Sequence, residues 1–171
     1  MGERMRLSGL LALPLAAALL VACGKSPPAA ALKRGDPAPA FQLAQLGGGM
    51  VRFPEEMRGQ PTVIRFWADW CRYCEREMKD LDVIYQRRRA SGLRMLAVNV
   101  GQDPATVERF VGRLGISYPA LLDESAATAK RYGVTGLPTT FFVHGDGRVH
   151  AKLLGEADAQ TFERLCAELQ K

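Results

Sequence analysis

The stretch Phe66-Trp67-Ala68-Asp69-Trp70-Cys71-Arg72-Tyr73-Cys74 decides the fold of this chain. Its two cysteines stand three residues apart, after an apolar strand-like run and at the start of a helical pattern. A helix N-terminus carries partial positive charge and unpaired N–H groups, which favour a thiolate over a thiol. We therefore expect Cys71 to be the reactive thiolate. Cys74, one turn further, is placed to attack a mixed disulfide formed at Cys71.

The sequence gives less support to two other roles of a Cys-x-x-Cys pair, a zinc site and a structural disulfide. A zinc site needs four ligands, and the sequence has no second Cys-x-x-Cys and no His-x-His cluster, so we predict no metal site. A structural disulfide usually closes a longer loop, and it gives no reason for the flanking Trp-Ala-Asp-Trp. The sequence therefore predicts a redox-active disulfide between Cys71 and Cys74. Because the cysteine pair is itself the redox centre, we expect no dissociable cofactor.

Residues 1–22 are typical of a signal peptide. Arg4 and Arg6 precede an apolar segment, residues 7–22, that is short for a transmembrane helix. The sequence Leu20-Val21-Ala22-Cys23 resembles a bacterial lipobox, which implies that Cys23 is lipidated and becomes the first mature residue. The alternative is an uncleaved anchor with an incidental cysteine. Both place the domain outside the cytoplasm, on the periplasmic side of a bacterial membrane, where thiols tend to be oxidised.

The remaining chain divides into a linker and one domain. Residues 23–35 are rich in Pro, Ala and Lys and show no periodic pattern, so we expect a tether. Residues 36–171 have the commonest size of a single domain. The chain has 23 basic and 18 acidic residues, a net charge of +5, and its basic residues are scattered. The only basic run, Arg87-Arg88-Arg89, falls at a predicted helix end where cations suit the helix dipole, so we expect no nucleic-acid partner.

The hydrophobic pattern predicts alternating strands and helices. Asp103 and Asp158 are the expected N-caps of two helices, and Pro104 suits the first turn of the helix that follows Asp103. This order predicts an α/β fold: a central mixed β-sheet flanked by helices on both faces, with an N-terminal β-hairpin. The predicted strands cover residues 41–43, 51–53, 62–67, 93–100, 119–122, 139–143 and 149–154, and the more clearly bounded helices cover 71–89 and 125–132.

Several motifs in combination resemble the TlpA/ResA/CcmG branch of the thioredoxin fold. The resemblance covers essentially everything from Gly35 to Lys171, including an extra helix–strand insertion over residues 104–122. It implies a membrane-tethered thiol-disulfide oxidoreductase outside the cytoplasm. The motifs are Trp70-Cys71-Arg72-Tyr73-Cys74, Cys74-Glu75-Arg76-Glu77, Gly133-Val134-Thr135-Gly136-Leu137-Pro138-Thr139-Thr140 and Gly35-Asp36-Pro37-Ala38-Pro39-Ala40-Phe41.

The resemblance also implies roles for individual residues. Pro138 is expected to follow a cis peptide bond in a loop against the cysteines, where the backbone of Leu137 pairs with an extended substrate segment. Glu77 is expected to take the proton of Cys74 as that sulfur becomes a nucleophile, although a solvated surface glutamate is the alternative. Trp70 is expected to shield the disulfide and offer a flat contact surface.

The activity implied by the branch is reduction of disulfides in extracytoplasmic proteins such as apocytochrome c or copper-site proteins. The membrane partner implied is a thiol-disulfide electron donor of the CcdA/DsbD type. A thiol oxidase of the same fold remains an alternative, because direction depends on the reduction potential. A Cu(I)-binding assembly chaperone is a second one, although its relatives space their cysteines more widely and add a histidine. The Thr-x-x-Cys context of peroxide-reducing relatives is absent.

Three positions depart from the branch pattern. The dipeptide Arg72-Tyr73 lacks the usual proline, and Arg72 favours the Cys71 thiolate and a more oxidising pair. Arg65 stands where thioredoxin has a buried acid, so it needs a partner, with Glu77 and Asp69 as candidates, or a path to solvent. Lys79 replaces a proline that kinks the helix in branch members.

Two further groups of residues are predicted to have no redox role. Cys166 shares an apolar helical stripe with Phe162, Leu165 and Leu169, which predicts a buried, inert thiol. His144 and His150 flank the last predicted hairpin turn and could face each other. Nothing in their spacing brings them to the cysteines, so we interpret them as ordinary surface histidines.

Overall fold

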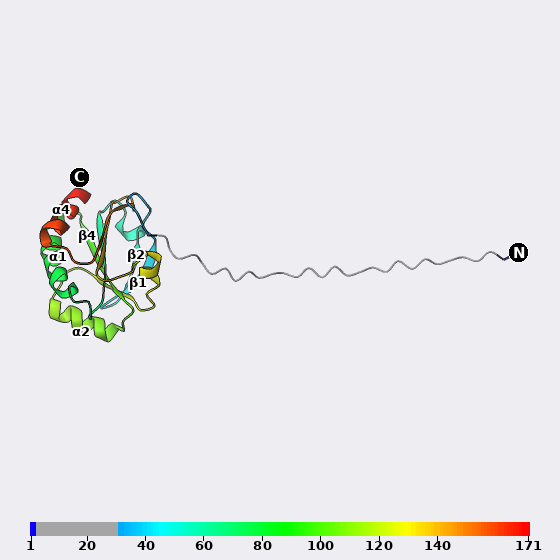
Figure 1. The fold of residues 1–171 in the computed structure, drawn as a ribbon, viewed down its shortest axis with the longest axis horizontal. Coiled ribbons are helices and arrows are strands. Elements are labelled where there is room, and N and C mark those ends of the chain that lie inside the picture. The colour runs from blue at the N-terminus through cyan, green and yellow to red at the C-terminus, as the bar shows by residue number, and fades with distance from the viewer. Residues whose placement is uncertain (3–30) are drawn as a thin grey trace.

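The computed structural model describes residues 1–2 and 31–171, and Figure 1 shows one compact domain formed within residues 31–171. The predicted signal peptide, the lipidation site Cys23 and most of the linker fall outside the described residues. In the described part of the chain, no helix is long and apolar enough to cross a membrane.

The domain contains seven strands and four α-helices among its described residues, in an alternating order. Two short 3-10 helices, Glu55–Met57 and Arg89–Ser91, complete it. The strands are β1 (Phe41–Gln45), β2 (Met50–Phe53), β3 (Thr62–Trp67), β4 (Arg94–Val100), β5 (Ala120–Asp123), β6 (Thr139–Val143) and β7 (Val149–Leu154). The helices are α1 (Cys74–Arg88), α2 (Pro104–Leu114), α3 (Ala127–Arg131) and α4 (Ala159–Leu169).

All seven strands form one mixed sheet in the order β2-β1-β5-β4-β3-β6-β7. β3, β4 and β5 run parallel, whereas the β1–β2 hairpin joins antiparallel through β5, and β6 and β7 join antiparallel beside β3. Parallel strands need crossover connections, and α1 and α2 supply them. Since β3 lies near the middle of the strand order, the cysteine motif that follows it lies at one end of the sheet, away from its edge strands.

Side chains of β3 alternate between the two faces of the sheet, so the strand separates two hydrophobic clusters. Val63 and Trp67 pack on the face covered by α1, α2 and α4, which Figure 1 shows along one side of the sheet. Ile64 and Phe66 pack on the opposite face, with α3 and the β1–β2 hairpin. All six residues of β3 are buried, as expected for a strand covered on both faces.

The helix–strand insertion is tied to α1 by polar contacts. One carboxylate oxygen of Asp82 accepts hydrogen bonds from the backbone N–H and the hydroxyl of Ser117, both at 2.7 Å. The Tyr118 hydroxyl donates to the Met78 carbonyl at 2.9 Å. Burial raises the pKa of this phenol well above its usual range. These contacts fix the insertion against the helix that carries Cys74.

The predicted mixed sheet with helices on both faces is confirmed, and most element boundaries agree. The strands over residues 62–67, 139–143 and 149–154 match, and Asp103 and Asp158 are N-caps whose carboxylates accept from Thr106 and Thr161. The helix predicted from Cys71 begins at Cys74 instead, because residues 68–74 form two successive turns. The helix predicted over 125–132 is shorter, because Ala126 ahead of it has a left-handed backbone conformation; Asp123 accepts from the first-turn N–H groups of Thr128 and Ala129.

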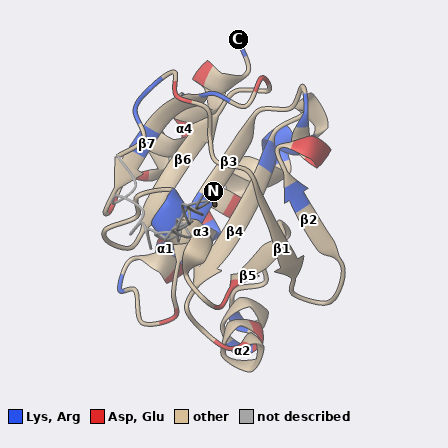
Figure 2. Cartoon of the chain, turned by 90° about the vertical axis from the view of Figure 1, so that its right-hand side faces the viewer, with Lys and Arg blue, Asp and Glu red and all other residues tan. Residues whose placement is uncertain are grey.

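The chain enters the domain at the turn between β6 and β7. The Gly35 N–H donates to the Val149 carbonyl at 2.8 Å, and Pro37 forms a bridge with Arg148. This turn is at the end of the sheet away from the cysteines, because β6 starts next to the cis-proline loop and runs away from it. Figure 2 shows basic and acidic positions interspersed over several elements.

Candidate active site

The two cysteines form a disulfide where β3 passes into α1. The Cys71 N–H donates to the Ala68 carbonyl at 3.2 Å and the Cys74 N–H to the Cys71 carbonyl at 3.0 Å, so Cys71 lies in the turn just before the helix. Their Cα atoms are 5.4 Å apart. Cys71 retains 5% exposure and Cys74 none, which leaves Cys71 as the only sulfur-bearing residue of the pair with contact to solvent. The predicted order of attack is therefore compatible with the geometry, although Cys71 is less exposed than we expected.

The loop before β6 adopts the expected conformation. The Leu137–Pro138 peptide bond is cis, and Pro138 is buried. The Thr139 hydroxyl donates to the Gly136 carbonyl at 2.6 Å, and the Pro138 carbonyl accepts from the Gly155 N–H at 2.8 Å. Within the described residues, the backbone N–H and carbonyl of Leu137 form no hydrogen bond. That peptide edge is free to pair with an incoming strand.

Glu77 is fully buried, so the alternative of a solvated surface glutamate is wrong. It lies one turn beyond Cys74 on α1. Its Oε1 accepts from the Ala157 N–H at 2.8 Å, and its Oε2 accepts from the Arg65 guanidinium. Because a carboxylate has about four lone-pair sites, this arrangement leaves acceptor capacity for a proton from Cys74.

Arg65 is buried as well, and Glu77 is its partner. Its exposure is zero, so it does not reach solvent, and Asp69 instead bonds Gln102. Its second terminal nitrogen donates to the Thr140 hydroxyl at 2.9 Å. Burial lowers the pKa of the Arg65 guanidinium, and the adjacent Glu77 carboxylate partly offsets this. Because of this pairing, a substitution that neutralises Glu77 would leave the buried Arg65 charge unpaired.

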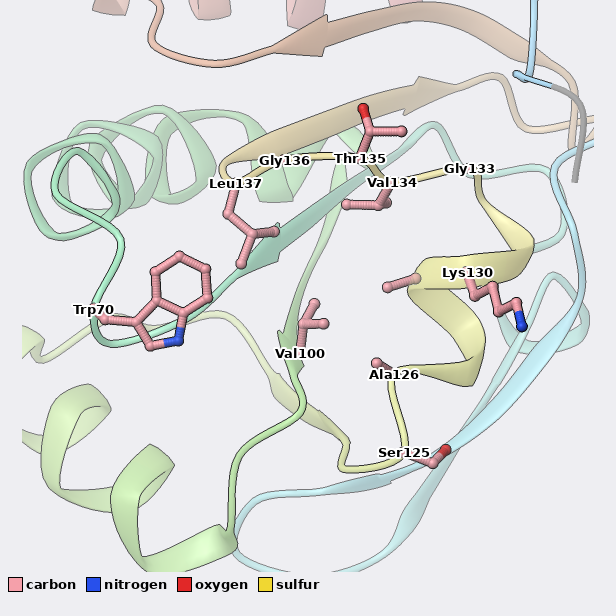
Figure 3. A pocket seen from close by; sticks show the side chains of 11 residues that line it. Trp70, Val100, Ser125, Ala126, Lys130, Gly133, Val134, Thr135, Gly136 and Leu137 are labelled. Atoms are coloured by element: carbon pink, nitrogen blue, oxygen red, sulfur yellow. The ribbon is translucent and has the colours of Figure 1, made fainter. Parts of the chain in front are cut away.

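An apolar hollow opens beside Trp70 and the cis-proline loop. Its volume is about 540 Å³. Figure 3 shows the Trp70 and Leu137 side chains on one side of it, Val100 below and α3 opposite. Trp70 is 69% exposed, as expected for a contact surface. Gly133, Val134, Thr135 and Gly136 of the predicted cis-proline loop also line it. Sequence patterns did not single out the rest of this lining: Val100, Ser125, Ala126, Ala129 and Lys130.

Gln102 is a second residue that the sequence analysis did not identify. Its Oε1 accepts from the Asp69 N–H at 2.9 Å and from the Asn99 side-chain amide at 2.8 Å, so it braces the segment just before Trp70. Gln102 follows the end of β4 by two residues, and the ends of the parallel strands β3 and β4 lie at the same end of the sheet. This position could have indicated from the sequence that Gln102 lies near the cysteine motif. Lys79, by contrast, pairs with Glu75 on the exposed face of an unbroken helix.

Cys166 and the two histidines lie away from the disulfide. Cys166 is buried, and burial raises the pKa of its thiol to about 12, as expected of an inert thiol. The interpretation of both histidines as surface residues is wrong for His150, which is 7% exposed. Its ring bonds His144 at 3.1 Å and Glu168 at 3.0 Å. Among the described residues, no three His, Cys, Asp or Glu side chains form a metal-binding group.

A cysteine pair just ahead of a helix, facing a cis-proline loop on a mixed sheet of this order, defines a thioredoxin-fold thiol-disulfide oxidoreductase. Comparison with known proteins agrees. The chain belongs to the AhpC/TSA family, whose model matches residues 34–152.

Curated relatives and solved structures narrow this assignment. The chain is 35% identical over 130 residues to the thiol-disulfide oxidoreductase ResA of Geobacillus kaustophilus, covering 76% of this chain and 74% of the relative. It is 37% identical over 121 residues to ResA of Geobacillus thermodenitrificans, covering 71% and 69%. A Chlorobium tepidum structure described as thiol:disulfide interchange protein DsbE superposes with a TM-score of 0.78, at 25% identity over 82% of this chain and all of that one. The protein is a thiol-disulfide oxidoreductase of the ResA/DsbE type.

Proposed function

We propose that this protein is a membrane-tethered reductase of disulfides in extracytoplasmic proteins, such as apocytochrome c or copper-site proteins. The observation that carries this is the buried cysteine pair beside a free peptide edge at Leu137 and an open apolar hollow. Such a surface suits an extended, partly unfolded polypeptide better than a small thiol. Residues 36–171 form the catalytic domain, while residues 23–35 and a lipid on Cys23 supply the tether.

The reaction proceeds in two exchanges. The Cys71 thiolate attacks one sulfur of the substrate disulfide, so the substrate S–S bond breaks, a Cys71–substrate disulfide forms and one substrate thiolate leaves. Glu77 then takes the proton of Cys74. The Cys74 thiolate attacks Cys71, releases the second substrate thiolate and leaves the pair as a disulfide. The substrate gains two electrons and leaves as two thiolates. Glu77 returns the Cys74 proton to one of them, and solvent, which took the proton of Cys71 when its thiolate formed, protonates the other.

Substrate positioning falls to Trp70, Leu137 and Pro138. The backbone of Leu137 pairs with the extended substrate as an added strand, with Pro138 holding the loop against the disulfide. An apolar side chain next to the substrate cysteine fills the hollow between Leu137 and α3, and Trp70 covers it. The cysteine pair itself is the redox centre, so the cycle calls for no dissociable cofactor.

The cycle closes by electron transfer from a membrane thiol-disulfide donor of the CcdA/DsbD type. In an oxidising compartment, a reductase works only if it is continuously re-reduced, so we expect Cys71 and Cys74 to be mostly dithiols in cells. Trapping thiols with a mass-adding alkylating reagent in cells with and without the donor measures this. A shift to the disulfide on loss of the donor supports the proposal. A disulfide in the presence of the donor contradicts it and favours a thiol oxidase.

A further inference from the structure

Arg65 connects the two parts of the active site. From the central strand β3, one guanidinium nitrogen reaches Glu77, three residues beyond Cys74 on α1. The other reaches Thr140, two residues beyond Pro138 on β6. In the pairing of β3 with β6, Arg65 and Thr140 stand directly opposite each other, so their side chains are neighbours on the same face. Glu77 also accepts a hydrogen bond from the backbone N–H of Ala157, in the loop before α4.

Arg65 is the cation that contacts the buried Glu77 carboxylate directly. A buried carboxylate without a cation takes up a proton, because burial disfavours its charged form. The other titratable groups near the pair are Arg76 on α1, with its partner Glu156 in the loop before α4, and Tyr118 ahead of β5. Arg76 and Glu156 bond each other at the surface, where solvent screens them. Burial keeps Tyr118 neutral at ordinary pH.

We propose that Arg65 is a positioning residue for disulfide exchange: it keeps Glu77 ionised, so that Glu77 can take the proton of Cys74 at neutral pH. In that step the Cys74 S–H bond breaks, an O–H bond forms at Glu77 and the Cys74 thiolate attacks Cys71. This inference rests on the role proposed for Glu77. The guanidinium acts through Glu77 and touches no reacting sulfur.

The test measures the resolution step as a function of pH in the full chain. Reduced protein is mixed with an aromatic disulfide, and the second, slower release of aromatic thiol reports attack by Cys74 on the mixed disulfide. The variants are Arg65→Met, Arg65→Lys, Glu77→Gln and the double variant Arg65→Met/Glu77→Gln. Arg88→Met is the matched control, because it removes a different ion pair of α1, to Glu163 on α4, without touching Glu77.

Arg65→Met should resolve about tenfold or more slowly at neutral pH and recover toward alkaline pH, since Glu77 now ionises only there. Arg65→Lys should stay closest to the unchanged protein. Glu77→Gln should be slow without that recovery, and the double variant no slower than Glu77→Gln. Carbon-13 NMR of labelled glutamate provides a readout besides activity. The Glu77 carboxyl signal should titrate at higher pH in Arg65→Met than in the unchanged protein.

Two results separate the possible failures. If Glu77→Gln is slow but Arg65→Met lowers the rate equally at every pH, as Arg88→Met would, Arg65 is merely structural and the inference is overturned. If Glu77→Gln resolves at the unchanged rate, the proposed role of Glu77 fails, and the part of Arg65 in the reaction fails with it. Should Arg65→Met not fold, Arg65→Gln decides. Its amide is polar but uncharged, so Glu77 loses its cation, and the pH profile and the NMR signal should shift as described for Arg65→Met; no shift overturns the inference.

Discussion

The two faces of the sheet are equally buried but differ in chemistry. On the face covered by α3 and the β1–β2 hairpin, aromatic rings pack against one another, with Phe66 and Tyr132 at 5.1 Å and Tyr132 and Phe141 at 5.1 Å between centroids. The face covered by α1 and α4 holds the disulfide and the Arg65–Glu77 pair. Packing of aromatic rings stabilises the first face without removing a charge from water. On the second face, burying the Arg65–Glu77 pair costs desolvation free energy, and in our proposal this pair serves proton transfer from Cys74.

The same strand serves both faces. Ile64 and Phe66 point into the aromatic cluster, while Arg65 points at α1, because successive side chains of a strand alternate. A chain can therefore place a functional cation between two core residues without disturbing the opposite face. Substitutions on the aromatic face should therefore change the free energy of unfolding, whereas substitutions at the charged groups of the α1 face should change the rate of disulfide exchange.

The largest expected difference lies within the cysteine pair itself. Cys74→Ala should accumulate a mixed disulfide with substrate through Cys71, because nothing resolves it, whereas Cys71→Ala should trap none, because Cys74 has no exposure. Non-reducing gels of the two variants, with the double variant as control, measure this. Trapping by the Cys71→Ala protein would show that Cys74 can be the attacking sulfur and would contradict the assignment.

A change on the aromatic face should affect stability alone. Phe141→Ala removes a fully buried ring that packs on Tyr132 and Phe66, and should cost about 3–5 kcal/mol of unfolding free energy. The pH dependence of the resolution step should stay unchanged, because no charged group near Cys74 is altered. Denaturant unfolding and the exchange assay check the two parts. A displaced pH profile would mean that the faces are coupled.

The smallest effect is expected at Cys166. Burial raises the pKa of this thiol to about 12, so it stays protonated, and hence unreactive, at every pH below that value. The reduced native protein and its Cys166→Ala variant should therefore take up the same number of alkylating groups at pH about 8, and should differ by one group only after unfolding. A difference of one in the native state would show that Cys166 is accessible.

Local patterns were sufficient to predict much of the fold. The apolar run over Thr62–Trp67 marks a strand buried on both faces, and the capping aspartates Asp103 and Asp158 mark helix starts through their short side chains. The start of α1 was misplaced because a strand-to-helix connection can contain turns that look helical in sequence. These turns put Cys71 ahead of the helix.

The interior of the site depends on contacts that sequence spacing does not contain. Arg65 meets Thr140 only through the register of β3 and β6, across 75 residues of chain. The apolar hollow likewise forms from four segments brought together by topology: the turn with Trp70, the end of β4, α3 with the residues just before it, and the loop before β6. His150 was misjudged for a related reason, since α4 covers it through Glu168.

The attachment of the chain beside Val149 gives the domain a polarity. Gly35 enters at one pole and the cysteines lie at the other, so an anchor at Cys23 would hold the redox end facing away from the bilayer. A domain of this size is about 35–40 Å across, and 13 residues span about 40 Å at most when extended. If residues 23–35 are the tether that we propose, that length would let the domain turn its disulfide either to substrates in the compartment or to a donor in the membrane.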